Sequence, residues 1–339
     1  MAKKIKVSFH GGNHSVSRGV GFYASNLSKA LQENSEVELT DKDPDLIHYP
    51  FFDLFYPTLP VIKKLPTIVS IHDLTPLAMA DRYPKGVKGT LALLHQRLAV
   101  QSLKAIITDS QYSKGDIVKY FNIDFEKVFV TPLAIDPVFE KEYSKTKLQE
   151  IKEKHHLPDK FVLVVSGGPN PNKNLPAIAD VTKELGIPLV IVGKGMIQEI
   201  KEPVHPELID MIKLKKYTHI IYPGFVSTED LVGYYQLATI YCQPSLYEGF
   251  GLPLLEAMTA QCLVVSSNAT SLPEIYHHDA ITFDPSDLHD MKVALQKALD
   301  LSPKERALQI SKAKERSKDF DWKKTAEETV KVYKEVLCL

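Results

Sequence analysis

Short runs rich in β-branched residues alternate with helical patterns along most of the chain, and this alternation constrains the fold more than any other feature. The first set of runs is KIKVSF, VELT, DLIHYP, TIVSIHD, AIITDS and KVFVT. Helical patterns separate several of them, at VGFYASNLSKALQ, at residues 86–102 and at residues 113–120. Strands that alternate with helices predict strand-helix-strand units and a parallel sheet.

The same rhythm begins again after residue 160. The second set of runs is FVLVVSGG, PLVIVGKG, THIIYPGF, TIYCQPS, LVVSSN and AITFD. Helices are expected at residues 175–185 and 228–237 and after Pro253, with a polar helix between PLVIVGKG and THIIYPGF. A chain of 339 residues also exceeds the usual size of one hydrophobic core. The sequence therefore predicts an α/β protein with two doubly wound halves and a cleft between them.

Two segments break the rhythm. Residues 141–160, KEYSKTKLQEIKEKHHLPDK, are highly charged and contain no strand pattern, so they are interpreted as a domain boundary with a solvated helix inside. The last fifty residues are helical only, and apolar Ala326, Val330, Tyr333 and Val336 or Leu337 give the final helix a buried stripe. The predicted parts are an N-terminal domain, a C-terminal domain and a final helix, at residues 1–150, 151–320 and 321–339.

Composition excludes several classes of partner. The chain has 41 basic and 42 acidic residues, a balance that argues against a nucleic-acid partner. Cys242, Cys262 and Cys338 are too few and too scattered for a disulfide framework or a zinc site, which favours a reducing, cytoplasmic compartment and a packing role. No apolar run approaches the roughly 20 residues that span a bilayer, so any membrane contact would be peripheral.

The segment SLYEGFGLPLLEAM carries the strongest chemical signal. Gly249 and Gly251 precede a helix that a proline helps to start, so backbone amides and the helix dipole are available to an anion. Glu248 and Glu256 bracket this turn. Because carboxylates repel phosphate, they are expected to accept hydrogen bonds from hydroxyl groups instead. The combination indicates a ligand in which a sugar is attached to a phosphate.

Three other loops follow predicted strands, where ligands of open parallel sheets bind. HGGNHSVSRGVGFY, with Gly19 and Gly21, either contacts a phosphate or forms a plain tight turn. SIHDL contains His72, which is either a hydrogen-bonding group of the site or a satisfied core or capping histidine. SGGPNPNKN places Lys173 before a helix, either for phosphate or for solvent, and Lys194 in IVGKG is a weaker case of the same kind.

Two further clusters are assigned no metal. DKDPD at residues 41–45 is interpreted as a surface turn. The adjacent pairs His155-His156 and His277-His278 do not face one way on a helix or strand.

The motifs in this order resemble the retaining GT-B-fold glycosyltransferases with an E-x(7)-E segment, in particular the bacterial mannosyltransferase-like group. The resemblance covers nearly the whole chain. Besides SLYEGFGLPLLEAM, the similar segments are GVGFYASNLSKAL, SIHDLTPL, TDSQYSKGDIVKYF, NKNL, YPGFVSTEDLVGYYQLATIYCQPS, SLPEI and FDPSD. It implies two Rossmann-like domains that face each other across a cleft, with the final helix crossing back to the first domain.

The resemblance also implies roles for individual residues. Glu248 would hold hydroxyls of the donor sugar, and Glu256 would bind the ribose. Lys173 would neutralise the leaving diphosphate, His72 would face the donor sugar, and Val226 would meet the nucleobase. The loop that binds the diphosphate would comprise Gly249, Phe250, Gly251 and Leu252. Further donor contacts are expected from Gly19, Gly21 and Lys194.

The implied reaction needs neither a cofactor nor a metal. A hexose would pass, with retained configuration, from a nucleoside-diphosphate sugar to a glycan or lipid-linked acceptor, with possible contact to the cytoplasmic membrane face. HDLTPL favours GDP-mannose over a UDP-sugar as the donor. The alternatives are a non-catalytic partner subunit that binds nucleotide sugars, or another enzyme of this fold such as a sugar epimerase or phosphorylase.

The chain departs from the family pattern at several positions. Asn172 precedes Lys173 where relatives carry an Arg-Lys pair, and Gly167 or Gly168 replaces a further arginine. Phe22 stands where an arginine is common, and QCLV replaces Gly-x-Pro-Val. One positive charge at the diphosphate is therefore missing. Either donor binding is weaker, or Lys194 or Arg18 compensates.

Overall fold

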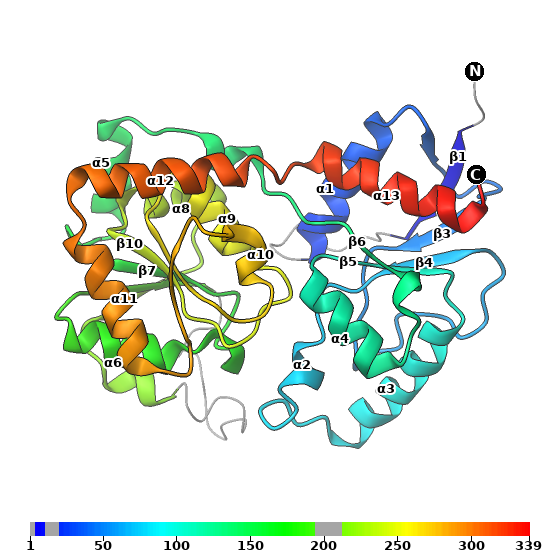
Figure 1. Ribbon diagram of the computed structural model, residues 1–339, viewed down its shortest axis with the longest axis horizontal. Helices are drawn as coiled ribbons and strands as arrows, with labels where there is room; N and C mark the ends of the chain where they lie inside the picture. The colour runs from blue at the N-terminus through cyan, green and yellow to red at the C-terminus, as the bar shows by residue number, and fades with distance from the viewer. Residues whose placement is uncertain (1–3, 11–19, 194–211) are drawn as a thin grey trace. The chain divides into compact units, whose positions relative to one another are not determined.

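The structure, a computed structural model, describes residues 4–10, 20–193 and 212–339 and divides into two compact units (Figure 1). The first comprises the described residues of Met1–Ala134 together with Phe320–Leu339, and the second comprises those of Ile135–Asp319. The division falls before the charged stretch, because helix α5 (Lys145–Lys154) packs on helix α8 (Thr228–Leu237) of the second unit.

The first unit contains a six-stranded sheet of order β2-β1-β3-β4-β5-β6 with parallel pairing throughout. Parallel strands are covered on both faces, which is why β4 and β5 read as continuous apolar runs. The strands are β1 (Ile5–Phe9), β2 (Val37–Leu39), β3 (Leu46–Tyr49), β4 (Thr67–Ser70), β5 (Ala105–Thr108) and β6 (Val128–Val130). The helices are α1 (Val20–Glu33), α2 (Thr75–Ala78), α3 (Gly86–Gln101), α4 (Gln111–Phe121), the short η1 (Phe125–Lys127) and α13 (Trp322–Leu337).

The second unit contains a second parallel six-stranded sheet, of order β12-β11-β10-β7-β8-β9. Its strands are β7 (Val162–Val165), β8 (Leu189–Val192), β9 (Ile220–Gly224), β10 (Ile240–Gln243), β11 (Val264–Ser267) and β12 (Ile281–Phe283). Besides α5 and α8 its helices are α6 (Leu175–Glu184), α9 (Leu252–Thr259), α10 (Leu272–Tyr276), α11 (Leu288–Asp300), α12 (Pro303–Ser317) and the short η2 (Pro137–Glu140), η3 (Pro171–Lys173) and η6 (Lys213–Lys216). The two predicted parallel sheets are confirmed. The polar helix expected before β9 falls largely outside the described residues.

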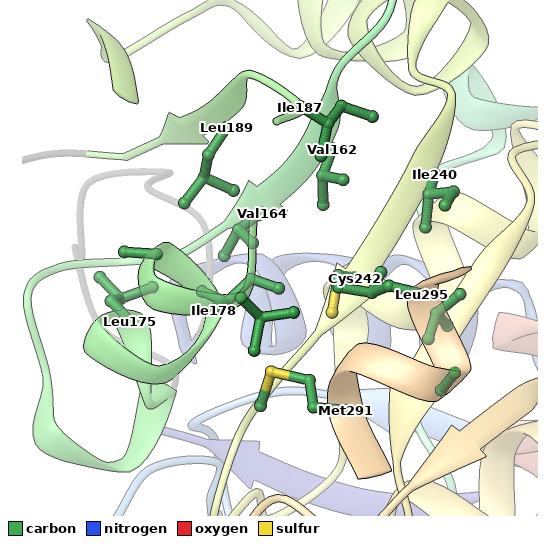
Figure 2. Packing of buried hydrophobic residues seen from close by; sticks show 14 of the residues in the cluster. Val162, Val164, Leu175, Ile178, Ile187, Leu189, Ile240, Cys242, Met291 and Leu295 are labelled. Carbon is green, nitrogen blue, oxygen red and sulfur yellow. The ribbon is translucent and has the colours of Figure 1, made fainter. Parts of the chain in front are cut away.

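One part of the core of the second unit lies between the sheet and helices α6 and α11. Figure 2 shows Val164 of β7 and Cys242 of β10 in the same cluster as Ile178 of α6 and Met291 of α11. Cys242 and Cys262 are buried, as their predicted packing role requires, whereas Cys338 is exposed.

The final helix, α13, belongs to the first unit and packs on α1, as the resemblance implied. Ala326, Val330 and Tyr333 are buried along its length, which confirms the predicted stripe. Val336 and Leu337 are only partly buried.

A buried chain of hydrogen bonds ties α13 to the sheet. The phenol of Tyr333 lies 2.7 Å from Nδ1 of His48 on β3, and Nε2 of His48 lies 2.9 Å from Oγ of Ser70 on β4. Ser70 in turn lies 2.8 Å from the phenol of Tyr23 on α1. Burial, together with the nearby His72, lowers the pKa of His48 to about 3. The neutral imidazole is therefore part of the folded structure.

The neutral state of His48 predicts a loss of stability in acid. As the pH falls below about 6.5, the unfolded chain takes up a proton that the folded chain excludes. The stability that neutral His48 contributes is complete above that pH and shrinks toward pH 3, by about 3 kcal/mol at pH 4.5. Urea unfolding monitored by fluorescence of Trp322, the single tryptophan, measures this effect because Trp322 lies on α13 beside Phe22 and Tyr23.

The variant His48→Gln isolates this contribution from that of other titrating groups. The difference in unfolding free energy between pH 7 and pH 4.5 is expected to be smaller by about 3 kcal/mol in His48→Gln than in the parent chain. Replacing the exposed His278 is the matched control and should leave the difference unchanged. Equal pH dependence in His48→Gln and the parent would contradict the assignment.

Candidate active site

The loops that carry the two strongest charged candidates follow neighbouring strands of the second sheet. The loop after β7 leads to Lys173, and the loop after β10 leads to Glu248. The strand order β9-β8-β7-β10-β11-β12 reverses direction between β7 and β10. Ligands of doubly wound sheets bind at this reversal, beyond the carboxyl ends of the strands. The two loops thus flank the position at which this topology favours a ligand.

Three donors hold the same oxygen of Glu248. Oε1 lies 2.6 Å from Nζ of Lys173, 2.6 Å from Oγ of Ser245 and 2.7 Å from Nε2 of Gln243. The side chains of Glu248 and Lys173 are only 10% and 14% exposed. Such partners offset the cost of taking a carboxylate out of water. The structure therefore brings two of the predicted catalytic residues together as an ion pair.

The second carboxylate oxygen of Glu248, Oε2, has no hydrogen-bond partner among the described residues. A carboxylate oxygen accepts hydrogen bonds from hydroxyl groups, so Oε2 can bind a sugar. The ammonium group of Lys173 has three donors, and the contact with Glu248 uses one of them. The remaining donors can bind a phosphate oxygen.

Sequence reasoning missed Gln243 and Ser245. Both are buried, and the Gln243 amide also lies 2.8 Å from Oγ of Ser245. The hydroxyl of Tyr241 donates to Oε1 of Gln243, which orients the amide group toward Glu248. The available signal was a pair of polar residues at the end of a buried strand, directly before the glycine turn.

Asn172, at a position where the family resemblance predicts an arginine, fastens the loop of Glu248. Its side-chain amide donates to the carbonyl of Tyr247 at 2.9 Å, and its own carbonyl accepts from the amide of Leu246 at 2.8 Å. The residue is buried. Asn172 therefore supplies structure to this loop, and the positive charge that contacts Glu248 comes from Lys173.

The glycine turn opens α9 in a conformation that favours glycine. Gly251 has φ of 116° and ψ of 46° and occupies the N-cap position of the eight-residue helix. Ser271 holds this turn in place, because its hydroxyl lies 2.9 Å from the carbonyl oxygens of both Glu248 and Phe250. The amides of Gly251 and Leu252 have no hydrogen-bond acceptor among the described residues. Two amides and the positive end of the helix dipole therefore suit an anion.

Replacing Gly251 with alanine is expected to lower the free energy of unfolding by about 2 kcal/mol. The left-handed conformation strains any side chain, and a Cβ atom there would lie 2.6 Å from Cδ2 of Leu272 and 3.2 Å from Cδ1 of Ile275. Urea unfolding monitored by circular dichroism measures the loss. Gly167→Ala is the matched control, because a Cβ at Gly167 meets no atom within 4 Å. Equal free energies of unfolding for the two variants would contradict the predicted strain at Gly251.

Glu256, the second carboxylate of the motif, lies on α9. Its Oε2 accepts a hydrogen bond of 2.8 Å from the phenol of Tyr235 on α8, and this phenol also lies 3.2 Å from the carbonyl of Pro253. The pair positions the Glu256 carboxylate near the start of α9. Its role toward a ribose stays a prediction.

His72 lies in the first unit, after β4, and both of its ring nitrogens face acceptors. Nδ1 lies 2.8 Å from a carboxylate oxygen of Asp109, and Nε2 lies 3.3 Å from the carbonyl of Pro50. Burial alone would lower the pKa of His72, but the charge of Asp109 and these hydrogen bonds outweigh it and raise the pKa. Sequence reasoning missed Asp109, which follows the buried strand β5 directly. The role of His72 toward a donor sugar stays a prediction.

The remaining predicted residues are placed as follows. Val226 is buried in the turn between β9 and α8, and Gly21 is the second residue of α1. Gly19, Arg18 and Lys194 lie outside the described residues. Their roles stay predictions.

A pocket of about 300 Å³ lies at the opposite edge of the second sheet. It is lined in part by Ile187, Pro188 and His219, which precede β8 and β9. This is the amino end of the strands, whereas Lys173 and Glu248 follow carboxyl ends. The pocket is therefore separate from the candidate site.

Residues 4–10, 20–193 and 212–339 offer neither a metal-binding cluster nor a membrane-spanning helix. These residues contain no group of three or more His, Cys, Asp or Glu side chains arranged to hold a metal ion. His155, one of the histidines considered above, lies 3.1 Å from a carboxylate oxygen of Asp230. Within the same ranges, no helix combines the length and apolar composition that crossing a bilayer requires.

Comparison with known proteins finds relatives among bacterial mannosyltransferases. Relatives include the serotype-specific mannosyltransferase WbdA of Escherichia coli, 28% identical over 88% of this chain and 38% of the relative. The O-antigen chain mannosyltransferase B of Escherichia coli is 28% identical over 79% of this chain and 70% of the relative. The chain thus spans less than two fifths of the length of the WbdA relatives.

Solved structures share the fold. Sucrose-phosphate synthase from Thermosynechococcus elongatus superposes with a TM-score of 0.73 at 16% identity, over 98% of both chains. Anabaena HepE in complex with UDP and glucose also gives a TM-score of 0.73, at 14% identity, over 98% of this chain and 100% of HepE. The expected architecture of two Rossmann-like domains is confirmed.

Family models match both parts of the chain. The model described as Glycosyltransferase Family 4 matches residues 5–139, and the model described as Glycosyl transferases group 1 matches residues 147–316, half of the chain. The second match contains the Lys173–Glu248 pair and the turn at Gly251. The chain therefore belongs to the family of glycosyl transferases group 1.

Proposed function

We propose that this protein is a retaining hexosyltransferase that uses a nucleoside-diphosphate sugar and a glycan or lipid-linked acceptor. The observation that carries the proposal is the Lys173–Glu248 ion pair beside the turn at Gly251, at the reversal of a doubly wound sheet. This arrangement offers a cation and backbone amides for a diphosphate and a carboxylate oxygen for a sugar hydroxyl.

GDP-mannose is the first choice of donor, and a UDP-sugar is the second. The mannosyltransferases among the relatives support mannose, at 28% identity. The HepE structure in complex with UDP and glucose supports a nucleoside-diphosphate sugar as the donor class, at the level of the fold.

The transfer breaks the bond between the anomeric carbon and the diphosphate, so negative charge grows on the leaving phosphate. The amides of Gly251 and Leu252, the dipole of α9 and the ammonium of Lys173 are positioned to stabilise that charge. Glu248 would orient the sugar through Oε2. A leaving phosphate oxygen would take the proton of the acceptor hydroxyl as the new glycosidic bond forms on the same face, which retains the configuration. Under this proposal His72 faces the donor sugar.

A donor screen tests the proposal. Isothermal titration with GDP- and UDP-sugars should detect binding, and release of the nucleoside diphosphate should follow with an acceptor, or slowly with water. Proton NMR of the product should show the anomeric configuration of the donor. Absence of binding to every nucleoside diphosphate would overturn the proposal. Sugar release that depends on phosphate would indicate a phosphorylase, and a changed sugar without any acceptor would indicate an epimerase.

A non-catalytic partner subunit is the second candidate function. The observation that favours it is the neutral side chain of Asn172, and the glycine at Gly167 or Gly168, where the family resemblance predicts arginine. Binding without turnover, unaffected by Glu248→Ala, would support this function instead.

Gly167→Arg tests whether the missing charge limits donor binding. A side chain at Gly167 has room, because a Cβ there meets no atom within 4 Å and the backbone is not left-handed. Because Gly167 follows β7 at the same sheet edge as Lys173, an added cation should tighten nucleoside-diphosphate binding by about tenfold at low salt and less at high salt. Titration calorimetry measures the change, with Gly167→Gln as the uncharged control. Equal affinities for the two variants would contradict the expectation.

A further inference from the structure

Helix α3 of the first unit is apolar on two opposite faces. One face, with Leu93, Ala99 and Val100, is buried in the core. The opposite face carries a stripe of four large aliphatic side chains that are exposed: Val87 at 80%, Leu91 at 63%, Leu94 at 57% and Leu98 at 56%. At 100° per residue these four positions fall within an arc of about 60°. Scattered exposed leucines are ordinary, whereas a continuous stripe on one helix indicates an interaction surface.

The stripe continues beyond the C-terminal end of α3. Ile62, in the loop before β4, is 84% exposed, and its neighbour Val61 is also exposed. The loop is fixed beside the helix end, because Oγ of Ser102 donates to the carbonyl of Val61 at 3.0 Å and Nζ of Lys63 lies 2.8 Å from Oγ of Ser102. We refer to Val61, Ile62, Val87, Leu91, Leu94 and Leu98 as the α3 surface. Within the first unit, α3 lies at the periphery, away from the strands of the sheet (Figure 1).

Basic residues border the α3 surface. Lys88 and Arg97 are exposed on α3 and lie on opposite sides of the stripe. Around the helix axis, Lys88 is about 100° from Val87 in one direction and Arg97 is about 80° from it in the other. The helix contains no acidic residue. From residue 54 to residue 104 the chain has seven basic and two acidic residues, whereas the whole chain has 41 basic and 42 acidic residues. The seven basic residues are Lys63, Lys64, Arg82, Lys85, Lys88, Arg97 and Lys104.

We propose that the α3 surface docks the protein onto an anionic lipid surface. A helix that lies in a membrane interface combines an apolar face with flanking lysine and arginine, and anionic lipids attract those side chains. A symmetric contact with a second copy through this stripe would bring Lys88 and Arg97 close to their equivalents, where like charges repel. The charge pattern therefore favours lipid over self-association. This docking does not depend on sugar transfer, so its test and the donor screen can fail separately.

Sedimentation with vesicles tests the proposal. The full chain is expected to bind vesicles with about 30% phosphatidylglycerol at least tenfold more tightly than phosphatidylcholine vesicles, with binding weakened at high salt. Leu94→Glu should reduce binding about tenfold by placing a charge in the apolar face. Leu308→Glu, at an exposed leucine on α12 of the second unit, is the matched control and should bind like the parent. Lys88→Glu with Arg97→Glu should remove the preference for anionic vesicles.

Four results of these experiments would contradict lipid docking by the α3 surface. Absence of vesicle binding, equal binding to both kinds of vesicle, or unchanged binding by Leu94→Glu would overturn it. A concentration-dependent dimer in sedimentation velocity that Leu94→Glu abolishes would assign the α3 surface to a second copy and would also overturn it. Circular dichroism confirms that each variant is folded, and Leu94→Gln replaces Leu94→Glu in the test if the latter is not.

Discussion

Replacing Glu248 with glutamine is expected to lower the rate of sugar transfer about 10³-fold, which corresponds to about 4 kcal/mol of transition-state stabilisation. Glutamine keeps an oxygen for Lys173, Gln243 and Ser245, so the local structure should be preserved. The group that replaces Oε2 is an NH₂ donor, which cannot accept a hydrogen bond from a sugar hydroxyl. Steady-state kinetics with the best donor measure the loss.

The same variant should bind the nucleoside diphosphate with an affinity within about threefold of the parent, since the proposed diphosphate site consists of backbone amides and Lys173 and does not include Glu248. Glu184→Gln is the matched control, because Glu184 is exposed and pairs with Lys292. Turnover of Glu248→Gln at the parent rate would remove Glu248 from the catalytic site. A parent chain that binds the donor without turning it over would favour the partner-subunit function.

Replacing Lys173 with methionine should lower the free energy of unfolding at neutral pH by about 4 kcal/mol. The substitution leaves the Glu248 carboxylate buried without its positive partner, and only the neutral donors of Gln243 and Ser245 remain on Oε1. Urea unfolding monitored by circular dichroism measures the loss. Nucleoside-diphosphate binding should weaken in parallel, because the same ammonium group is expected to contact the phosphate.

Two comparisons separate this effect from a general loss of a lysine. Lys292→Met breaks an exposed ion pair with Glu184 and should change stability by less than about 0.5 kcal/mol. The double variant with Lys173→Met and Glu248→Gln removes both charges and should recover most of the lost stability. A double variant as unstable as the sum of the two single variants would show that Lys173 and Glu248 do not interact.

The strands were predictable because parallel strands buried on both faces read as continuous apolar runs. TIVS, AIIT, VLVV and LVIV each became a buried strand at the expected position. Strand order was not predictable in the same way, because it depends on which side each crossover helix packs. The order in the second unit nevertheless explains why Lys173 and Glu248, 75 residues apart, form an ion pair.

The charged stretch at residues 141–160 shows a different limit of sequence reasoning. Its composition indicated a solvated helix, and α5 is indeed mostly exposed. Ile151 is its buried residue and lies against Gly233 of α8, where any larger residue would collide with it. Ile151 docks the helix together with the ion pair of Lys154 and Asp230, whose atoms lie 2.7 Å apart. Such isolated contacts leave no periodic pattern in the sequence.

The charged residues of the candidate site were predictable from type and position, but their partners were not. Glu248 and Lys173 stand out in loops, whereas Gln243 is the last residue of β10 and Asp109 directly follows β5, so both read as parts of strand ends. Asn172 was expected only as a missing charge, yet it anchors the loop of Glu248. Burial and hydrogen bonding decide these roles, and neither is visible from residue type alone.

A crystal structure of the protein with a bound nucleoside diphosphate tests the central claim most directly. We predict that phosphate oxygens lie within hydrogen-bonding distance of the backbone amides of Gly251 and Leu252 and of Nζ of Lys173. A diphosphate bound at the pocket before β8 and β9, or anywhere that leaves the turn at Gly251 without contact, would contradict the account.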